Sequence, residues 1–280
     1  MPRIALVTNT AAGVPPEEIA RYGITQVPMQ INFLDGHYDE GSELSTEEFY
    51  ARLLREEVVP STSPPSVGRY ARIFHALAAD HEIILSIHIS QALSSSYRNA
   101  LAAAEQVSEA RICLHNSGSV TLGTGLQVLT AARLIKQGAD IEAVLAALQQ
   151  QRDRTLVVFA PAALKYMRNS GRVGPIAMTL ATWLNIKPVI KVSDGKLELL
   201  DRMHSWDAAL NRQIDEGERF SQDEMPSEIA VCHINAPIAA ESFAGRVRER
   251  FPQAHVYIAE VGPAMGIHIG PGALGLATYR

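Results

Sequence analysis

The sequence lacks any apolar run that approaches the roughly 20 residues needed to span a lipid bilayer. It also lacks an excess of positive charge: 25 Lys and Arg stand against 30 Asp and Glu, and the pI is near 6.0. These absences argue against integral membrane association and against nucleic acid as the main partner. The chain enters a strand pattern at Arg3 without a signal-peptide cleavage region, so we expect a cytoplasmic protein.

Cysteine is scarce as well. The two cysteines, Cys113 and Cys232, each lie inside an apolar strand-like run. Nothing in the sequence supports a disulfide between them. We expect two buried, reduced thiols, as is usual in cytoplasmic proteins.

Several motifs of catalysis and cofactor binding are missing. The nucleophile elbow G-x-S-x-G is absent, and residues 116–119 match it only in part. Residues 118–125 lack the lysine of a Walker A loop, and the N-terminal glycines do not follow GxGxxG. No His-x-x-x-His pair and no cysteine pair has the spacing of metal ligands, so scattered structural histidines are the better interpretation. We therefore expect no metal and no cofactor.

The first half of the chain alternates strand patterns with helix patterns. Ile4 to Val7 and Glu82 to Ile89 are apolar runs typical of buried strands, and Ser45 begins a capping box for the helix that follows. This alternation predicts a Rossmann-like parallel sheet with flanking helices. The other strands expected are Gln26 to Phe33 and Arg111 to Leu114, and the helices are Pro16 to Tyr22, Thr46 to Glu57, Val67 to Ala79, Tyr97 to Glu109, Gly123 to Lys136 and Ile141 to Arg152.

The second half follows a different pattern. Ile186 to Lys191 and Lys196 to Leu200 predict two strands joined by a hairpin turn at Ser193 to Gly195. Hairpins and a non-alternating order predict a separate α+β domain with a mixed sheet, so we expect domains at 1–153 and 154–280. The remaining strands expected are Leu156 to Phe159, Ile229 to Ile234, Val256 to Ile258 and Gly272 to Thr278, and the helices are Pro161 to Arg168, Trp206 to Arg219 and Ile238 to Phe251.

A stiff polar loop, PSTSPPS, occupies residues 60–66 between two predicted helices. Pro64 keeps the preceding Ser63 extended, and Ser66 is a plausible N-cap for the next helix. Thr62 and Ser63 are then free to point their hydroxyls at a ligand. A rigid connection with capping serines is the alternative interpretation.

Two further loops carry similar chemistry. The run Ser94 to Ser96 stands at the start of a predicted helix, where backbone N–H groups can meet an anion, although Ser94 can equally act as an N-cap. His268 precedes Gly270-Pro-Gly272, where the backbone can approach a ligand closely. Hydroxyls and an imidazole can hydrogen-bond a carboxylate or phosphate without a buried arginine. Nearby apolar surface would accept a hydrocarbon chain, at roughly 0.8 kcal/mol for each buried CH₂.

The chain resembles the DegV family, a group of bacterial fatty-acid-binding proteins, along nearly its whole length. The motifs gain specificity from their order and spacing. They are Val7 to Thr10, Thr62 to Ser66, Ile89 to Ser94 with Tyr97, Leu164 to Arg168 with Gly171 and Arg172, Leu184 to Pro188 and His268 to Gly275.

The resemblance implies two α/β domains with the tail of a long-chain fatty acid held in a tunnel between them. Thr62 and Ser94 would then hydrogen-bond the carboxylate, with His268 close enough to assist, and Ser63, Ser95 and Ser96 share their loops. Arg172 matches the arginine of a Gly-Arg turn. Arg202 matches a basic residue that faces the partner at the entrance in relatives that work with a fatty-acid kinase. Such relatives present the acid for acyl-phosphate formation and are carriers rather than catalysts.

The tail wall is predicted from the apolar pattern and the resemblance together, with ordinary core packing as the alternative for each residue. Its candidates are Ile31, Phe33, Met167, Ile176, Leu180, Leu184, Ile186, Ile190 and Gly270. The departures from the family pattern are Asn9-Thr10 for Asp-Ser, Ser95-Ser96 for Gly-Thr, Ser170 for glycine and Asn116 for aspartate.

Our leading hypothesis is a non-enzymatic fatty-acid carrier that presents its ligand to a fatty-acid kinase. One alternative is a hydrolase or acyltransferase that uses a serine of the run Ser94 to Ser96 with His268. Another is a regulatory protein that senses a lipid and binds a protein partner.

Overall fold

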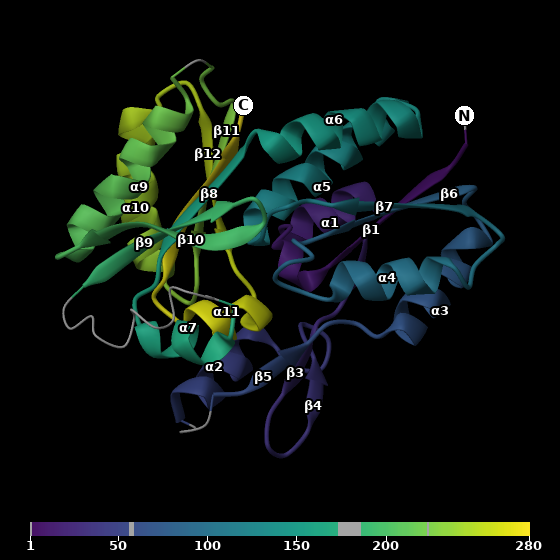
Figure 1. Cartoon of the computed structure of the whole chain (residues 1–280), viewed down its shortest axis with the longest axis horizontal. Helices are drawn as coiled ribbons and strands as arrows, with labels where there is room; N and C mark the ends of the chain where they lie inside the picture. The colour runs from purple at the N-terminus through teal and green to yellow at the C-terminus, as the bar shows by residue number, and fades with distance from the viewer. Residues whose placement is uncertain (1, 56–58, 173–185, 223) are drawn as a thin grey trace.

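The computed structural model describes residues 2–55, 59–172, 186–222 and 224–280, and two main sheets lie side by side in it (Figure 1). The shape is that of an α/β protein, as the sequence predicts. Within the described residues, no helix combines the length and the apolar character that crossing a membrane requires.

A four-stranded parallel sheet in the order β2-β1-β6-β7 forms the first half, as predicted. Successive residues of its strands enter different cores, because side chains alternate between the two faces. Leu6 packs with α5 and α6 residues, whereas Val7 packs with α3 and α4 residues. The elements are β1 (Ile4–Asn9), η1 (Thr10–Ala12), α1 (Pro16–Tyr22), β2 (Thr25–Val27), α3 (Val67–Ala78), β6 (Ile83–His88), α4 (Ser96–Ala104), β7 (Arg111–Asn116), α5 (Thr121–Lys136) and α6 (Ile141–Asp153).

A six-stranded mixed sheet in the order β10-β9-β8-β13-β11-β12 forms the second half, as predicted. The β9–β10 hairpin turns at Asp194 and Gly195, which both have positive φ. In Figure 1, α9 and α10 cover the outer face of this sheet. The elements are β8 (Thr155–Ala160), α7 (Leu164–Ser170), β9 (Lys187–Ser193), β10 (Lys196–Met203), α9 (Trp206–Phe220), β11 (Glu228–His233), α10 (Pro237–Arg250), β12 (His255–Glu260), α11 (Pro263–Ile269) and β13 (Leu274–Tyr279).

A small antiparallel sheet, β4-β3-β5, lies beside α2, α7 and α11 and corrects three sequence predictions. The strand expected over Gln26 to Phe33 is two strands, interrupted at Pro28, which has no N–H for a ladder. The loop 60–66 contains a short strand. Strand β4 was not predicted, and Glu40 directly after it is buried. The elements are β3 (Gln30–Asn32), β4 (His37–Asp39), α2 (Thr46–Arg55) and β5 (Ser61–Ser63).

The predicted helix caps are present. Ser66 Oγ accepts the N–H of Arg69 at 3.2 Å at the start of α3. Ser45 and Glu48 form the reciprocal capping box before α2. These local bonds satisfy N–H groups that a helix start leaves open.

Helix α5 joins the two halves of the molecule, because it packs against both main sheets. Leu122 and Leu126 enter the core on the inner face of the six-stranded sheet, whereas Val128 and Leu129 enter the core of the four-stranded sheet. Arg133 then donates two hydrogen bonds of 2.6 Å to the carboxylate of Glu228 on β11. The division at residues 153 and 154 remains a prediction about domains.

The two cysteines, Cys113 and Cys232, are buried free thiols, as expected. Among the described residues, no group of three or more His, Cys, Asp or Glu side chains has an arrangement that holds a metal ion.

Candidate ligand-binding site

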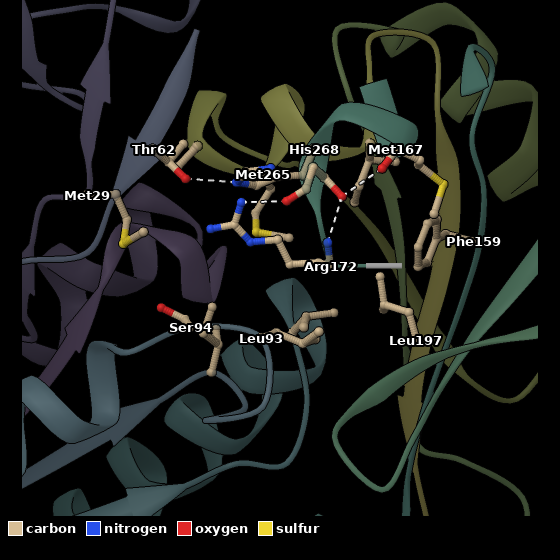
Figure 2. Close-up of a pocket in the computed structure, with 15 residues that line it drawn as sticks. Met29, Thr62, Leu93, Ser94, Phe159, Met167, Arg172, Leu197, Met265 and His268 are labelled. Carbon is tan, nitrogen blue, oxygen red and sulfur yellow. Dashed lines mark hydrogen bonds between the residues drawn. The ribbon is translucent and has the colours of Figure 1, made fainter. Parts of the chain in front are cut away.

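A mostly apolar cavity lies between the two main sheets, and Figure 2 shows the side chains that line it. The volume of the cavity is about 610 Å³ with its open end included. Its described lining residues are Met29, Thr62, Ile89, Leu93, Ser94, Val120, Phe159, Met167, Ser170, Arg172, Leu197, Ala264, Met265, His268 and Ile269.

Three predicted head-group residues, Thr62, Ser94 and His268, line this one cavity. The hydroxyl of Thr62 lies 2.8 Å from Nε2 of His268. Thr62 is the middle residue of β5 and pairs with Ile31 of β3, so the small sheet fixes its backbone. Ser94 approaches from another loop, across the cavity in Figure 2. The structure therefore brings these polar groups to the same apolar cavity, from different sides.

The imidazole of His268 is neutral near pH 7. Burial, together with the smaller effect of the nearby charge of Arg172, lowers its pKa to about 3. Nδ1 has no hydrogen-bond partner among the described residues. A proton on Nε2 can be donated to the Thr62 oxygen, which leaves the Thr62 hydroxyl proton free for a ligand.

His268 lies in the last turn of α11 and not in a loop, which corrects the sequence prediction. Helix α11 begins with Pro263 at its first position and ends before Gly270, whose φ is +93°. Proline at the start and glycine after the end are ordinary helix boundaries. The helix escaped detection because it is short and contains Gly266.

The side chain of Ser94 is oriented by its own loop. Its Oγ accepts the backbone N–H of Ser96 at 3.2 Å. The hydroxyl proton of Ser94 is then available to donate toward the cavity.

The other candidate serines do not line the cavity within the described residues. Ser96 is fully buried, where it accepts from the Asn9 amide at 2.7 Å and bonds the Tyr70 hydroxyl at 2.9 Å. Ser95 occupies the N-cap position of α4, and Ser63 accepts from Asn32 at 3.0 Å. The hydrogen bonds of Ser96 and Ser63 support the segments that carry Ser94 and Thr62.

The two predicted partner-facing arginines lie in different surroundings. Arg172 is exposed but also lines the cavity, with its guanidinium between Thr62 and Ser94 in Figure 2. An Nη1–H of Arg172 donates to the Ser170 carbonyl at 2.7 Å, which holds the side chain back along its own turn. Arg202 is exposed on β10 and is not among the described lining residues.

Of the predicted tail-wall residues, Met167 lines the cavity. Ile31, Phe33 and Ile190 do not; they pack with other residues of the surrounding core. Ile186 is half-buried outside the cavity. The backbone of Gly270 lies against the ring of Tyr166, where a Cβ would collide with it. Ile176, Leu180 and Leu184 lie outside the described residues.

Sequence reasoning missed much of the apolar wall. Met265 and Ile269 lie four residues apart on α11 and flank His268, a helical spacing that would reveal them once the helix is known. Phe159 is the penultimate residue of β8, and Leu197 is the second residue of β10. No local signal separates such residues from ordinary core. The lining residues not predicted are Met29, Ile89, Leu93, Val120, Phe159, Ser170, Leu197, Ala264, Met265 and Ile269.

The family model described as "Uncharacterised protein, DegV family" matches residues 3–280 of this chain. A DegV domain-containing protein of Halalkalibacterium halodurans is 31% identical over 280 residues, which cover 100% of this chain and 99% of that relative.

Two solved structures have the same fold over almost their entire length. A DegV family protein from Thermus thermophilus, described for its fatty acid binding, matches with a TM-score of 0.91, 27% identity and 99% of both chains covered. A fatty acid binding protein from Bacillus subtilis matches with a TM-score of 0.92, 24% identity and 100% of both chains covered.

Proposed function

Because this chain belongs to the DegV family, we propose that it binds a long-chain fatty acid in the cavity between its two main sheets. The observation that carries the proposal is the hydrogen-bonded pair of Thr62 and His268, which lines the same apolar cavity as Ser94. The fatty acid binding described for the Thermus thermophilus structure supports the class of ligand.

The carboxylate accepts hydrogen bonds from Thr62 and Ser94. His268 donates from Nε2 to the Thr62 oxygen, so that the Thr62 proton points to the ligand. Arg172, whose guanidinium lies beside these groups in Figure 2, supplies positive charge at the same end of the cavity. Charge-assisted hydrogen bonds are roughly twice as strong as neutral ones, so this end orients the acid.

The acyl tail lies along the apolar wall, beside Leu93, Phe159 and Leu197. The wall also includes Met29, Met167 and Met265. Methionine is unbranched and adapts its shape readily, so these side chains can widen a narrow cavity as the tail enters. Burial of each CH₂ contributes roughly 0.8 kcal/mol, which makes the tail the main source of affinity.

Native mass spectrometry of the purified protein tests this proposal. We expect a bound mass that corresponds to a long-chain fatty acid, together with uptake of labelled oleate after the lipid is removed. Protein that carries no lipid and fails to take up oleate would contradict it.

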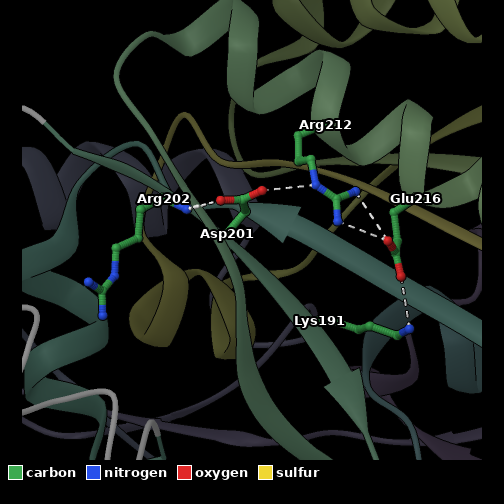
Figure 3. Close-up of polar contacts among 5 residues, drawn as sticks. All are labelled: Lys191, Asp201, Arg202, Arg212 and Glu216. Carbon is green, nitrogen blue, oxygen red and sulfur yellow. Dashed lines mark hydrogen bonds and ion pairs between the residues drawn. The ribbon is translucent and has the colours of Figure 1, made fainter.

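We propose further that the protein presents its acid to a fatty-acid kinase and carries the acyl phosphate away. Figure 3 shows an ion-pair chain in which Asp201 bonds Arg212 and Glu216 bonds both Arg212 and Lys191. The Arg202 side chain points away from these ion pairs, and the residue is exposed at the surface. The surface position supports a contact with a partner.

Arg202→Ala is expected to leave oleate affinity unchanged and to slow acyl-phosphate formation when purified fatty-acid kinase and ATP are added. Arg72→Ala removes an exposed arginine from α3 and serves as the control. Loss of oleate binding in Arg202→Ala would instead make Arg202 part of the pocket.

The geometry favours a carrier over a serine hydrolase. The hydrogen bond of His268 goes to Thr62, and within the described part of the chain no serine of the run Ser94 to Ser96 bonds His268. An imidazole with a pKa near 3 is a poor general base at pH 7. A serine-reactive fluorophosphonate probe should therefore fail to label the protein.

A further inference from the structure

The carboxyl of Glu40 connects three segments around the ligand cavity. The side chain is buried, with 5% of the residue exposed. Its Oε1 accepts the backbone N–H of Ala264 at 2.8 Å, and its Oε2 is hydrogen-bonded to the hydroxyl of Thr10. Neither Thr10 nor Ala264 is close to Glu40 in sequence, so these bonds hold separate segments together.

The bond to Ala264 supplies the N-terminal cap that α11 otherwise lacks. Gly262 stands at the N-cap position without a side chain, and Pro263 has no N–H. The N–H of Ala264 therefore needs an acceptor from elsewhere, and Glu40 provides it. Gly262 must remain small for this purpose, because a Cβ there would lie 2.5 Å from Oε1 of Glu40.

The same helix carries His268 one turn after Ala264. Within the described structure, the imidazole of His268 makes one hydrogen bond, to Thr62. The position of the imidazole therefore depends mainly on the backbone of α11. Because α11 has only seven residues, a shift at its start also moves the buried imidazole of His268 near its end. Ala264, Met265 and Ile269 also line the cavity, so they would move together with His268.

The bond to Thr10 extends the network to another residue of the cavity wall, Met29. Thr10 Oγ1 accepts the N–H of Met29 at 2.9 Å, and Met29 lines the cavity. Because that oxygen accepts from Met29, the Thr10 proton is directed to Glu40. The Thr10–Glu40 pair thus connects η1, which follows β1, and the segment before β3 to α11.

We propose that Glu40 is a positioning residue for the head-group site: it caps α11 from outside the helix and so holds His268 within hydrogen-bond distance of Thr62. The ligand part of this inference rests on the proposed fatty-acid binding, whereas the position of His268 can be measured without any ligand.

Glu40→Ala tests the proposal. We expect the imidazole resonances of His268 in ligand-free protein to shift or broaden, and oleate affinity to fall about tenfold, as for the loss of roughly one buried hydrogen bond. Glu40→Gln keeps an oxygen for Ala264 and an amide N–H for Thr10, so it should stay within about threefold of the wild type. Gly262→Ala, whose φ of −64° suits alanine, should reproduce the effect of Glu40→Ala by displacing the carboxyl.

Asp140→Ala is the matched control, because Asp140 caps α6 through the N–H of Ala143 at 2.8 Å and α6 contributes no described residue to the cavity. It should lower the unfolding midpoint yet leave both readouts unchanged. The proposal is overturned if Glu40→Ala and Gly262→Ala leave the His268 resonances in place, or if Asp140→Ala moves them equally. If wild-type protein binds no oleate while Glu40→Ala still shifts the His268 resonances, the fatty-acid function is contradicted and the positioning role is supported.

Discussion

The hydroxyl of Thr62 and the imidazole of His268 are in contact although 206 residues separate them in the chain. No local sequence pattern predicts this contact, because a polar side chain in a surface loop and one in a binding site look the same in the sequence. The sequence supplied Thr62, Ser94 and His268 as candidates through their chemistry, and the family resemblance supplied their grouping. Arg172 at the cavity and Glu40 behind it required the folded chain.

Thr62→Val and Ser94→Ala together should weaken oleate binding while the fold persists. Each removes a hydroxyl that faces the head group, and the buried carboxylate then lacks partners worth about 1–3 kcal/mol in total affinity. Isothermal titration with oleate measures the loss. Ser95→Ala removes a neighbouring hydroxyl that makes no side-chain cap bond, so it should bind as wild type does. Equal affinity in the double variant, with an unchanged circular dichroism spectrum, would refute the head-group assignment.

His268 should make the protein less stable as the pH falls. Its pKa is about 3 in the folded chain against an ordinary value of 6.5, so between these values the unfolded chain holds a proton that the folded chain excludes. Stability therefore rises with pH across this window, by up to about 1.4 kcal/mol per pH unit for one proton. His268→Gln removes that proton from the unfolded chain.

Urea unfolding at pH 5, 6 and 7 tests this expectation. The free energy of unfolding of the wild type should fall more steeply toward pH 5 than that of His268→Gln. Buried His88, whose pKa is also about 3, and Glu40, whose pKa burial raises, remain in both proteins and cancel in the comparison. Parallel slopes would show that His268 titrates normally in the folded chain.

At the scale of elements, the strength of the local pattern decides what the sequence can predict. Strand β6 is buried along its whole length and reads as a continuous apolar run, so it is recognised easily. The β9–β10 turn carries Asp194 and Gly195, which favour positive φ. In contrast, β3, β4 and β5 have three residues each, too few to display a period of two. Helix α11 has two turns interrupted by glycine, which hides its period as well.

The β9–β10 hairpin is fastened to the loop that leads to Ser94. The hydroxyl of buried Ser90 donates to the Gly195 carbonyl at 2.7 Å, and Leu197, two residues after Gly195, lines the cavity. Ser90→Ala leaves that carbonyl without its partner, at a cost of about 1–3 kcal/mol in unfolding free energy. We also expect weaker oleate binding, because both the Ser94 loop and Leu197 lose a common anchor.

Ser221→Ala is a suitable comparison for Ser90→Ala. Ser221 is equally buried, and its hydroxyl donates to the Gly217 carbonyl at 2.7 Å, away from the described cavity wall. Chemical denaturation should show a loss for both variants. The loss should be smaller for Ser221→Ala, because the backbone N–H of residue 221 still donates to the Gly217 carbonyl, at 3.0 Å in the wild type. Oleate titration should separate the two variants. If both variants bind oleate equally well, the hairpin contact is structural only.

At the scale of the whole molecule, the cavity is composite. Its described wall takes Met29, Ile89 and Val120 from the first 153 residues and Phe159 and Leu197 from the remainder. A ligand in this space contacts both main sheets, which α5 and the Arg133–Glu228 ion pair already connect. A ligand that binds only the folded chain raises its stability by mass action. Fatty acid should therefore stabilise the two halves together, in one transition.

The length of the acyl chain should control how large this stabilisation is. Each CH₂ buried in the cavity contributes roughly 0.8 kcal/mol, so palmitate, with eight more CH₂ groups than octanoate, should bind far more tightly. For delipidated protein with palmitate at about 100 times its Kd, mass action gives roughly 2.7 kcal/mol, which corresponds to a rise in Tm of about 5 °C for a chain of this length. Octanoate at the same concentration should raise the Tm little, although it carries the same carboxylate. Differential scanning calorimetry with both acids makes the comparison, and palmityl alcohol reports on the tail without the charge. Equal shifts for octanoate and palmitate would mean that the head group supplies the affinity and that the apolar space between the sheets is not where the tail lies.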